Sequence, residues 1–283
     1  MQRVVTITAL RAQIKTWRDQ NQTIAFVPTM GNLHQGHFSL VKKAAELADK
    51  VVVSIFVNPL QFDDKTDLAA YPRTIETDIQ ILNSVTCNIL FTPTIDDIYP
   101  QGMFPHTKVT VPNMDDKLCG FMRPGHFDGV ATVVTKLLNI VQADIAVFGE
   151  KDYQQLLLIK TLVRNLNLPV DIVGCPTHRE QSGLAMSSRN QSLTTQQLQQ
   201  APALYQVLLS IKHEIEQGNQ DFTALQHHAV SKLLALGFEP EYVDIRREDD
   251  LEFAKPGNNE LRILAAARLG RTRLIDNIAC DLA

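Results

Sequence analysis

Residues 28–37, with the sequence PTMGNLHQGH, decide the fold that we predict for this chain. They follow an apolar run, Ile24–Val27, that predicts a buried strand, and they lead into residues 38–48, which have the periodicity of a helix. A strand, a His-x-Gly-His turn and a helix form an arrangement suited to a triphosphate, because backbone amides at a helix start favour an anion. Gly36 removes a side chain that would hold a phosphate away from the backbone. The motif therefore makes nucleotidyl transfer our leading hypothesis.

The two histidines of this motif, His34 and His37, can both donate hydrogen bonds on one side of the first helical turn. Two other interpretations remain open, namely a solvated helix cap and half of a metal site. A metal site needs a third ligand at a suitable spacing, and no cluster of histidine and cysteine in the sequence supplies one. The motif by itself therefore predicts no metal site.

Length and composition describe an ordinary globular protein. The 283 residues suit one large or two medium domains, and a hydrophobic content of 45% allows a full core. A net charge of -4, from 27 basic and 31 acidic residues, argues against a nucleic-acid-binding surface spread over the whole protein. No apolar stretch reaches membrane-spanning length, and the amphipathic N-terminal segment lacks the long apolar region of a secretory signal. The cysteines are scattered without C-x-x-C spacing, so we expect a cytoplasmic protein with neither structural disulfides nor zinc. From the net charge and the lack of a membrane-spanning stretch, we expect no nucleic-acid or membrane partner.

The first part of the chain, residues 1–175, alternates predicted strands with predicted helices. The strands are 24–27, 51–57, 88–91, 144–148 and 170–173, and the helices are 38–48, 74–84, 129–141 and 153–165. Such alternation is typical of an α/β domain with a parallel sheet and right-handed crossovers. Ligands of such sheets bind beyond the C-terminal ends of the strands, which is where the candidate site residues fall.

Residues 176–283 form a second, smaller predicted domain of α+β type, after a boundary within residues 175–190. Two predicted helices, 193–217 and 222–236, precede three segments with strand-like composition. These segments are 242–245, 261–267 and 273–278.

Two stretches place polar side chains directly after a predicted strand. Asn58 and Gln61 follow the second strand and offer amide groups to a ligand with hydroxyl and carboxylate groups, although the Asn-Pro pair alone is more typical of a turn. Gly149 and Lys151 follow the fourth strand, and a lysine in that position suits a phosphate. A capped helix with a surface lysine explains the second stretch equally well.

Two loops complete the candidate set. Ser187, Ser188 and Arg189 place two hydroxyls and a guanidinium in consecutive positions, as a clamp for a leaving pyrophosphate would, although a helix-capping role fits equally. Residues 118–129 form a Gly/Pro-rich connection that is either a positioning element or an ordinary turn. No Ser-His-Asp set, catalytic cysteine or G-x-G-x-x-G after the first strand competes with a phosphate-binding interpretation.

With these motifs in order, the sequence resembles the pantothenate synthetase (pantoate–β-alanine ligase) family. The matching stretches run almost end to end and are residues 27–37, 56–62, 71–74, 123–127, 148–155, 186–190 and 273–277. The resemblance implies a Rossmann-like ATP-binding domain, a smaller C-terminal lid domain and a homodimer. It also implies that ATP and (R)-pantoate give pantoyl adenylate and pyrophosphate, after which the amine of β-alanine attacks the adenylate to give pantothenate and AMP.

The resemblance implies a role for each matching residue. The ATP-binding residues would be Met30, Gly31, Asn32, Leu33, His34, Gln35, Gly36, His37, Gly149, Glu150, Lys151, Asp152, His178, Met186, Ser187, Ser188 and Arg189. Of these, the catalytic set would be His34, His37, Lys151, Ser187, Ser188 and Arg189, with His37 the candidate proton donor. Pantoate would be bound by Asn58, Gln61, His126 and Gln155, with Gln61 also near β-alanine. Mg²⁺ would accompany ATP, bound mainly through phosphates, with Asp78 a candidate acidic ligand.

Two positions depart from the pattern of the family. Asp128 stands where a basic or neutral residue is more often expected, and His178 stands where an apolar residue would lie beside the adenine. If the adenine contact at position 178 is made by the backbone, the side chain there should matter little.

Two alternatives to this function remain open. Another H-x-G-H adenylate-forming or nucleotidyl-transferring enzyme, such as a relative of the class I aminoacyl-tRNA synthetases, would use the same phosphate grip. The chain lacks a recognisable basic anticodon-binding region, and its Asn58/Gln61 pocket suits a small polyol acid. A nucleotide-binding sensor is the non-enzymatic alternative, because a fold alone does not establish activity.

Overall fold

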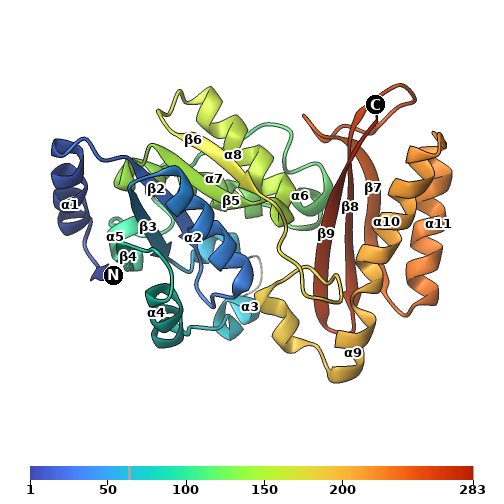
Figure 1. The fold of residues 1–283 in the computed structure, drawn as a ribbon, viewed down its shortest axis with the longest axis horizontal. Coiled ribbons are helices and arrows are strands. Elements are labelled where there is room, and N and C mark those ends of the chain that lie inside the picture. Colours follow the sequence, from blue (N-terminus) through green and yellow to red (C-terminus); the bar gives the residue numbers. More distant parts are fainter. Residues whose placement is uncertain (63–64, 283) are drawn as a thin grey trace. The chain divides into compact units, whose positions relative to one another are not determined.

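The computed structural model describes residues 1–62 and 65–282, and the chain divides into two compact units (Figure 1). The first unit comprises Met1–Glu150 and Leu158–Pro176, and the second comprises Lys151–Leu157 and Thr177–Ala283. The short segment Lys151–Leu157 thus belongs to the second unit, whereas the sequence assigned it to the first domain.

The first unit is built on a parallel sheet of six strands within the described residues, in the order β1-β4-β3-β2-β5-β6. The strands are β1 (Gln2–Val4), β2 (Ile24–Thr29), β3 (Lys50–Ile55), β4 (Ile89–Phe91), β5 (Ile145–Gly149) and β6 (Asp171–Cys175). The central residues of β2 and β3 are fully buried, as expected of apolar strands covered on both faces. The predicted parallel α/β sheet is therefore confirmed.

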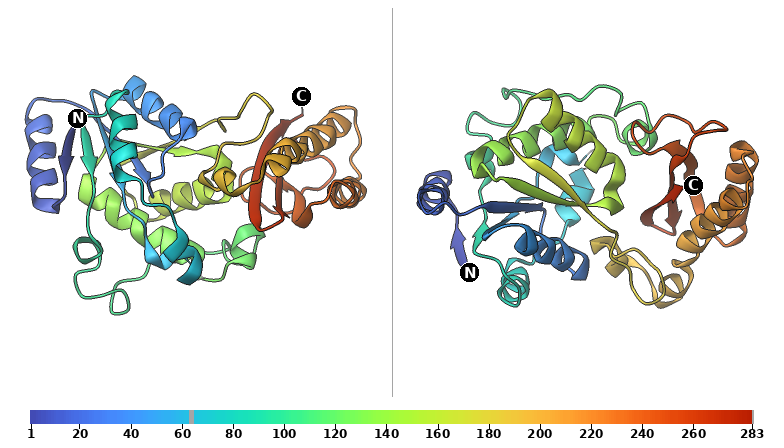
Figure 2. Two further views of the ribbon diagram at one scale, coloured as in Figure 1. Left: turned by 90° about the horizontal axis from the view of Figure 1, so that it is seen from below. Right: turned by 45° about the horizontal axis from the view of Figure 1, so that its top comes forward.

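Helices cover both faces of this sheet, with α2 on one face and α7 on the other (Figure 2). The helical elements of this part of the chain are α1 (Ile7–Asp19), α2 (Gln35–Leu47), η1 (Pro59–Gln61), α3 (Lys65–Ala70), α4 (Ile75–Asn83), α5 (Ile95–Ile98), α6 (Leu118–Met122), α7 (His126–Val141), η2 (Glu150–Asp152) and α8 (Tyr153–Asn165). Here η denotes a 3₁₀ helix. Helix α8 begins in the second unit and continues in the first.

The strand order places the candidate residues of the first unit at neighbouring strand ends. Strand β2 pairs with β3 on one side and with β5 on the other, so the direction of the chain across the sheet reverses between β2 and β5. His34 and His37 follow β2, Gln61 follows β3, and Gly149 and Glu150 lie at the end of β5. In a parallel sheet such a reversal is where ligands bind, beyond the C-terminal ends of the strands.

The second unit is an antiparallel sheet of three strands, in the order β7-β8-β9, with helices packed against it. Its elements are η3 (Ser188–Ser192), α9 (Thr195–Gln200), α10 (Ala203–Glu216), α11 (Phe222–Ala235), β7 (Glu239–Arg247), β8 (Glu260–Leu269) and β9 (Thr272–Asp281). A continuous apolar core joins α10 and α11 to β8, and includes Leu208, Leu233 and Ile263. The predicted α+β composition of this region is confirmed.

Three helix predictions were wrong at their boundaries. Helices α2 and α7 begin three residues earlier than predicted, at Gln35 and His126. The start of α2 is fixed by a side-chain cap at His34, and α7 starts directly after Gly125, whose φ of +78° interrupts the helical conformation. The single predicted helix 193–217 is two helices, α9 and α10, separated at Pro202. Proline has no backbone N–H and cannot continue the hydrogen-bond ladder of the helix that precedes it.

The structure also contains elements that the sequence did not predict, including strand β1 and helices α5 and α6. No helix in the described part of the chain is long and apolar enough to cross a membrane.

Candidate active site

The loop between β2 and α2 is held by the carboxylate of Asp78, which comes from α4 and is 1% exposed. Its Oδ2 accepts the backbone N–H of Asn32 at 3.0 Å, and its Oδ1 accepts that of Leu33 at 2.8 Å. The hydroxyl of Thr74 donates to Oδ1 at 3.2 Å. Both carboxylate oxygens are thus engaged by the protein, so the structure gives Asp78 the role of bracing this loop.

The backbone of this loop depends on glycine at position 31. Gly31 has φ +80° and Asn32 has φ +52°, so two consecutive residues adopt the left-handed conformation. A Cβ at position 31 would lie 3.0 Å from Ile55 and 3.1 Å from Asp78 Oδ2. The loop therefore combines a conformation that favours glycine with a space that excludes larger side chains.

The two histidines together cap the start of α2. The Nδ1 atom of His34 accepts the N–H of Gly36 at 3.1 Å, and the Nδ1 atom of His37 accepts the N–H of His34 at 3.2 Å. The ring centroids are 4.2 Å apart. Because a backbone N–H always donates, both Nδ1 atoms are acceptors, and each neutral ring carries its hydrogen on Nε2. The cap thus fixes both tautomers.

This arrangement changes which groups the motif offers to an anion. We expected backbone amides at the helix start to point toward a phosphate. In the structure the amides of Asn32 and Leu33 bind Asp78, and those of His34 and Gly36 bind imidazole nitrogens. The donors that the motif can direct to a ligand are therefore imidazole Nε2–H groups rather than these four amides.

A buried amide network lies at the end of β3. Asn58 is fully buried, and its Nδ2 donates to Oε1 of Gln61 and to the carbonyl of Gly129, both at 3.1 Å. Its Oδ1 accepts the hydroxyl of Tyr99 at 2.9 Å. Burial raises the pKa of Tyr99, so its hydroxyl remains protonated and donates. Asn58 therefore orients Gln61, and the donor nitrogen of Gln61 is turned away from Asn58.

The backbone of Gln61 is held as firmly as its side chain. Its carbonyl accepts Nη2 of Arg123 at 3.0 Å and Nδ1 of His126 at 2.8 Å. A carbonyl only accepts, so Nδ1 of His126 carries the hydrogen, the opposite tautomer to that of the two motif histidines. The structure thus brings together the predicted residues Asn58, Gln61 and His126, with Gln61 at the centre.

Helix α7 packs its backbone directly against this network. A Cβ added to Gly129 would lie 2.3 Å from the carbonyl oxygen of Leu60, far inside contact distance. The departure at Asp128 is explained by a salt bridge, because Lys108 Nζ lies 2.5 Å from its Oδ2. This hydrogen bond raises the pKa of Lys108. Asp128 is therefore charge-matched at its own position.

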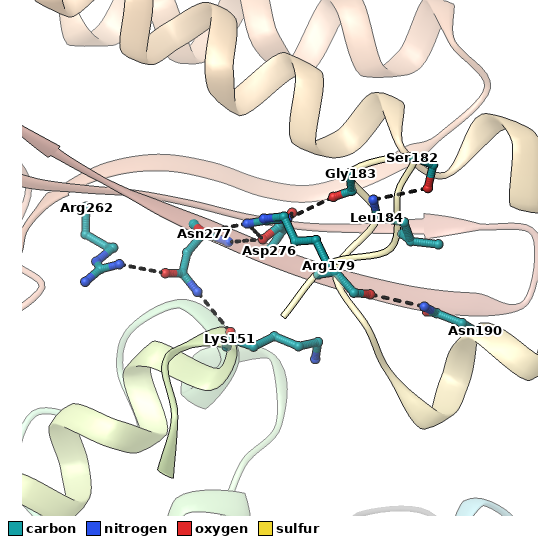
Figure 3. A network of polar contacts seen from close by, with 10 residues as sticks. Lys151, Arg179, Ser182, Gly183, Leu184, Asn190, Arg262, Asp276 and Asn277 are labelled. Atoms are coloured by element: carbon teal, nitrogen blue, oxygen red, sulfur yellow. Dashed lines mark hydrogen bonds and ion pairs between the residues drawn. The ribbon is translucent and has the colours of Figure 1, made fainter. Parts of the chain in front are cut away.

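In the second unit, Lys151 is held through its backbone. Its carbonyl accepts Nδ2 of Asn277 at 2.9 Å (Figure 3). Its ammonium lies 3.7 Å from the carboxylate of Asp152. Two residues later, the hydroxyl of Tyr153 donates to the carbonyl and to Oε1 of Glu248, both at 3.1 Å. Burial raises the pKa of Tyr153 to about 12, which keeps this hydroxyl protonated. These bonds explain why Lys151–Leu157 belongs to the second unit.

The Ser-Ser-Arg stretch follows a short hairpin over residues 178–186. The N–H of Met186 donates to the carbonyl of His178 at 3.0 Å, while the His178 side chain is exposed. Ser187 caps the 3₁₀ helix η3 by accepting the N–H of Arg189 at 3.2 Å. Arg189 is exposed, whereas Ser187 and Ser188 are half-buried.

Comparisons with known proteins agree across the whole chain. The sequence model of the family described as Pantoate-beta-alanine ligase matches residues 2–279. The pantothenate synthetase of Shewanella woodyi is 55% identical over 272 residues, which cover 96% of each chain. That of Pseudomonas aeruginosa is 53% identical over 282 residues and covers 100% of each.

This chain belongs to the pantoate–β-alanine ligase family.

Solved structures of pantoate–β-alanine ligases have the same fold. The pantothenate synthetase of Thermus thermophilus superposes with a TM-score of 0.91 at 40% identity, covering 98% of this chain and 99% of the other. A Francisella tularensis pantoate–β-alanine ligase, described as complexed with beta-gamma ATP and beta-alanine, has a TM-score of 0.82 at 39% identity, with coverage of 98% and 97%. The predicted family, Rossmann-like fold and enzyme class, a ligase, are confirmed.

For this member of the pantoate–β-alanine ligase family, the individual site residues stay predictions. Sequence reasoning missed Tyr99 and Arg179, and gave no role to Asp276 and Asn277 although their stretch resembles the family. A signal was present for the last two, because adjacent Asp and Asn inside a strand-like segment predict buried polar groups that require partners. Tyr99 carried no comparable local signal, since only the fold brings it to Asn58.

Proposed function

We propose that this protein condenses (R)-pantoate with β-alanine in two steps. The pantoate carboxylate attacks the α-phosphorus of ATP, giving pantoyl adenylate and pyrophosphate, and the amine of β-alanine then displaces AMP to give pantothenate. The observation that carries the proposal is the family match over residues 2–279, because it spans both units of the chain. It is supported by the 39% identical Francisella ligase, whose structure is described as complexed with beta-gamma ATP and beta-alanine.

The proposal assigns the polyphosphate to cationic and imidazole donors. Nε2–H of His34 and His37 would donate to phosphate oxygens, with tautomers already fixed by their caps. Lys151 and Arg189 would neutralise charge as pyrophosphate leaves, and Ser187 and Ser188 would add hydroxyl donors. Preorganised donors of this kind each contribute roughly 3–4 kcal/mol to transition-state stabilisation.

The remaining predicted ATP-binding residues belong to the same segments of the chain as these donors or lie next to them. They are Met30, Gly31, Asn32, Leu33, Gln35, Gly36, Gly149, Glu150, Asp152, His178 and Met186. At His178 the backbone, which already pairs with Met186, is proposed as the contact to adenine, since the His178 side chain is exposed.

We assign pantoate to the amide network. Gln61 would donate from Nε2 to the hydroxyl or carboxylate oxygens of pantoate, since its Oε1 is engaged by Asn58. Gln155, half-buried on α8, would be the second amide contact. Asn58 and His126 act by holding Gln61, and β-alanine would bind beside Gln61. No covalent enzyme intermediate is required.

Mg²⁺ would be bound mainly through ATP phosphate oxygens and water. Both oxygens of Asp78 already accept loop amides, and the described residues contain no group of three or more His, Cys, Asp or Glu side chains that could hold a metal ion. Mg²⁺ commonly keeps several waters and relies on substrate phosphates, which fits this donor set. When bound it would neutralise phosphate charge.

ATP–pyrophosphate exchange tests the first step. The purified protein should exchange labelled pyrophosphate into ATP when (R)-pantoate is present and should not do so with amino acids, and addition of β-alanine should yield pantothenate and AMP. Exchange that depends on an amino acid would favour the alternative of another H-x-G-H adenylate-forming enzyme. Binding of ATP without exchange would favour a sensor.

Single-turnover kinetics test the residue roles. Lys151→Ala and His37→Ala should each slow adenylate formation while the protein stays folded. If the two residues act on one polyphosphate, the double variant should lose less than the product of the single losses. An unchanged first step in Lys151→Ala, or an effect of His37→Ala limited to saturation by β-alanine, would contradict these assignments.

The homodimer and the cytoplasmic location belong to the same proposal. None of the four cysteines forms a disulfide within the described residues, as suits a reducing compartment. Sedimentation equilibrium at several protein concentrations tests the dimer, and cell fractionation tests the location.

A further inference from the structure

Two adjacent residues of β9, Asp276 and Asn277, connect the strand to both candidate phosphate-binding segments of the second unit (Figure 3). Each of them is 4% exposed. Neighbouring side chains on a strand point to opposite faces of the sheet, so the pair can hold two different segments at once. One segment contains Lys151, and the other is the hairpin that leads into Ser187–Arg189.

Asn277 holds Lys151 in a fixed direction. Arg262 donates to Oδ1 of Asn277 at 3.2 Å, which leaves Nδ2 to donate to the carbonyl of Lys151 at 2.9 Å. Arg262 is itself fixed, because it donates to Glu248 at 2.7 Å and stacks over the ring of Tyr153 at 3.8 Å. The amide of Asn277 therefore has one orientation that satisfies both partners.

Asp276 holds the hairpin through Arg179. The two guanidinium nitrogens lie 2.6 and 2.8 Å from the two carboxylate oxygens, and Nη1 also donates to the carbonyl of Gly183 at 3.1 Å, at the hairpin tip. The guanidinium stacks on Tyr205 at 3.6 Å. On the other side of the hairpin, Asn190 donates to the carbonyl of Ala185 at 3.1 Å, so the turn is tied to η3.

Stability alone is a poor explanation for this ion pair. Burial raises the pKa of Asp276, while the hydrogen bond and charge of Arg179 act against that rise. A buried ion pair loses hydration on both sides, and an apolar pair of similar volume commonly gives equal or greater stability. The bidentate geometry of the ion pair fixes the direction of the hairpin, which an apolar pair would not do.

We propose that Asp276 and Asn277 are positioning residues for adenylate formation. From one strand, β9, they hold both Lys151 and the Ser187–Arg189 segment in position. The inference rests on the proposed function, and it adds residues that do not themselves touch substrate. It requires that loss of either connection slows the step that uses Lys151 and Arg189, and leaves the later attack of β-alanine unaffected.

Asn277→Asp is the sharpest test of the Lys151 connection. The variant keeps the size of the side chain and an acceptor for Arg262, but it turns the donor to Lys151 into a second acceptor. We expect pantoate-dependent exchange to fall by about 10- to 100-fold, since a displacement of about 1 Å can cost that much. The rate of pantothenate formation from supplied pantoyl adenylate should be unchanged. In a Lys151→Ala background, Asn277→Asp should have little further effect, because both changes act through one group.

Arg179→Lys tests the hairpin connection. It keeps a positive charge opposite Asp276 but loses the two-pronged contact and the bond to Gly183, so we expect the same fall limited to adenylate formation. It also tests the inference if Asn277→Asp does not fold.

Glu241→Gln is the matched control on the same sheet. Glu241 binds Arg273 at 2.8 Å and Arg268 at 3.2 Å, and neither of these arginines bonds to Asp276 or Asn277 in the described contacts. This variant should lower the thermal unfolding midpoint without changing the exchange rate. The inference would be overturned if Lys151→Ala slowed the exchange reaction and Asn277→Asp did not. It would also be overturned if Asn277→Asp slowed exchange equally in the wild-type and the Lys151→Ala backgrounds. Absence of exchange in the wild type would instead contradict the proposed function itself.

Discussion

Replacing Asp78 with Asn tests whether a buried carboxylate holds the loop that carries both histidines. The carboxylate is 1% exposed and accepts two backbone N–H groups at 3.0 and 2.8 Å. In Asp78→Asn one oxygen becomes an NH₂ group that faces a backbone donor, so one bond is lost and the other loses its charge. A hydrogen bond to a charged group contributes about 1.5–3 kcal/mol and a neutral one about half as much, so we expect a loss of roughly 2–4 kcal/mol.

The measurement is chemical unfolding followed by the fluorescence of Trp17, the single tryptophan of the chain. Trp17 lies on α1 in the first unit, so its signal reports the unit that contains Asp78 even if the two units unfold separately. A loss of this size is a large part of the 5–15 kcal/mol typical of a folded domain. We also expect weaker saturation by ATP, because the loop that positions His34 and His37 is loosened.

Asp19→Asn is the control for Asp78→Asn. It removes a carboxylate from an exposed pair with Lys15, whose side chains are 62% and 74% exposed, and such pairs contribute little. If Asp78→Asn were as stable as wild type, the carboxylate would not brace the loop. If stability were unchanged and only Mg²⁺-dependent use of ATP were lost, Asp78 would be a metal ligand instead.

Three further expectations concern packing, thiol reactivity and pH. Gly129→Ala should cost about 3 kcal/mol or more in the same unfolding assay, because its Cβ would lie 2.3 Å from the carbonyl of Leu60 and α7 would have to move; a wild-type midpoint would contradict this close approach. Burial raises the pKa of Cys87 to about 12, so iodoacetamide at neutral pH should alkylate it only in unfolded protein, as mass spectrometry of native and urea-treated samples would show. Hydrogen bonds from Thr23 lower the pKa of Asp49 below its ordinary value, so Asp49 stabilises the fold above that value and the benefit disappears as pH falls through the lowered pKa. Wild type should therefore be more stable than Asp49→Asn at pH 7 and should converge with it in acid, and a constant difference at all pH values would contradict the assignment.

The sequence predicted those parts of the fold that depend on local patterns. Helix α8 has the predicted bounds, Tyr153–Asn165, because its apolar periodicity is complete within the segment. The start of α2 was missed because its cap is made by two histidines, which are not among the residues that usually cap a helix. Pro202 could have divided the predicted helix 193–217, since proline rarely continues a helix from its interior.

The sequence proposed members for the candidate site, which stay predictions, but it did not indicate the residues that hold them. Motif order made Gln61 and Lys151 candidate residues, but no local pattern indicates that Asp78 accepts the amides of residues 32 and 33 or that Tyr99 bonds to Asn58. Such contacts join residues 41 or more positions apart, and only the packed fold determines them. The assignment of Lys151–Leu157 to the second unit has the same origin, because its anchors, Glu248 and Asn277, are remote in sequence.

These contacts share one physical principle. A side chain with two polar atoms is oriented when one of those atoms is hydrogen-bonded within the protein. Nδ1 of each motif histidine accepts a backbone N–H, so its hydrogen lies on Nε2. Oε1 of Gln61 accepts from Asn58, so its donor faces elsewhere, and Oδ1 of Asn277 accepts from Arg262, so its donor faces Lys151. A group oriented before the substrate arrives does not lose rotational freedom when it binds, and its dipole need not reorganise as charge develops on the leaving pyrophosphate. Exchanging donor for acceptor at such a position reverses a fixed dipole, whereas truncation only removes it. The isosteric variants therefore test this architecture more directly than alanine does.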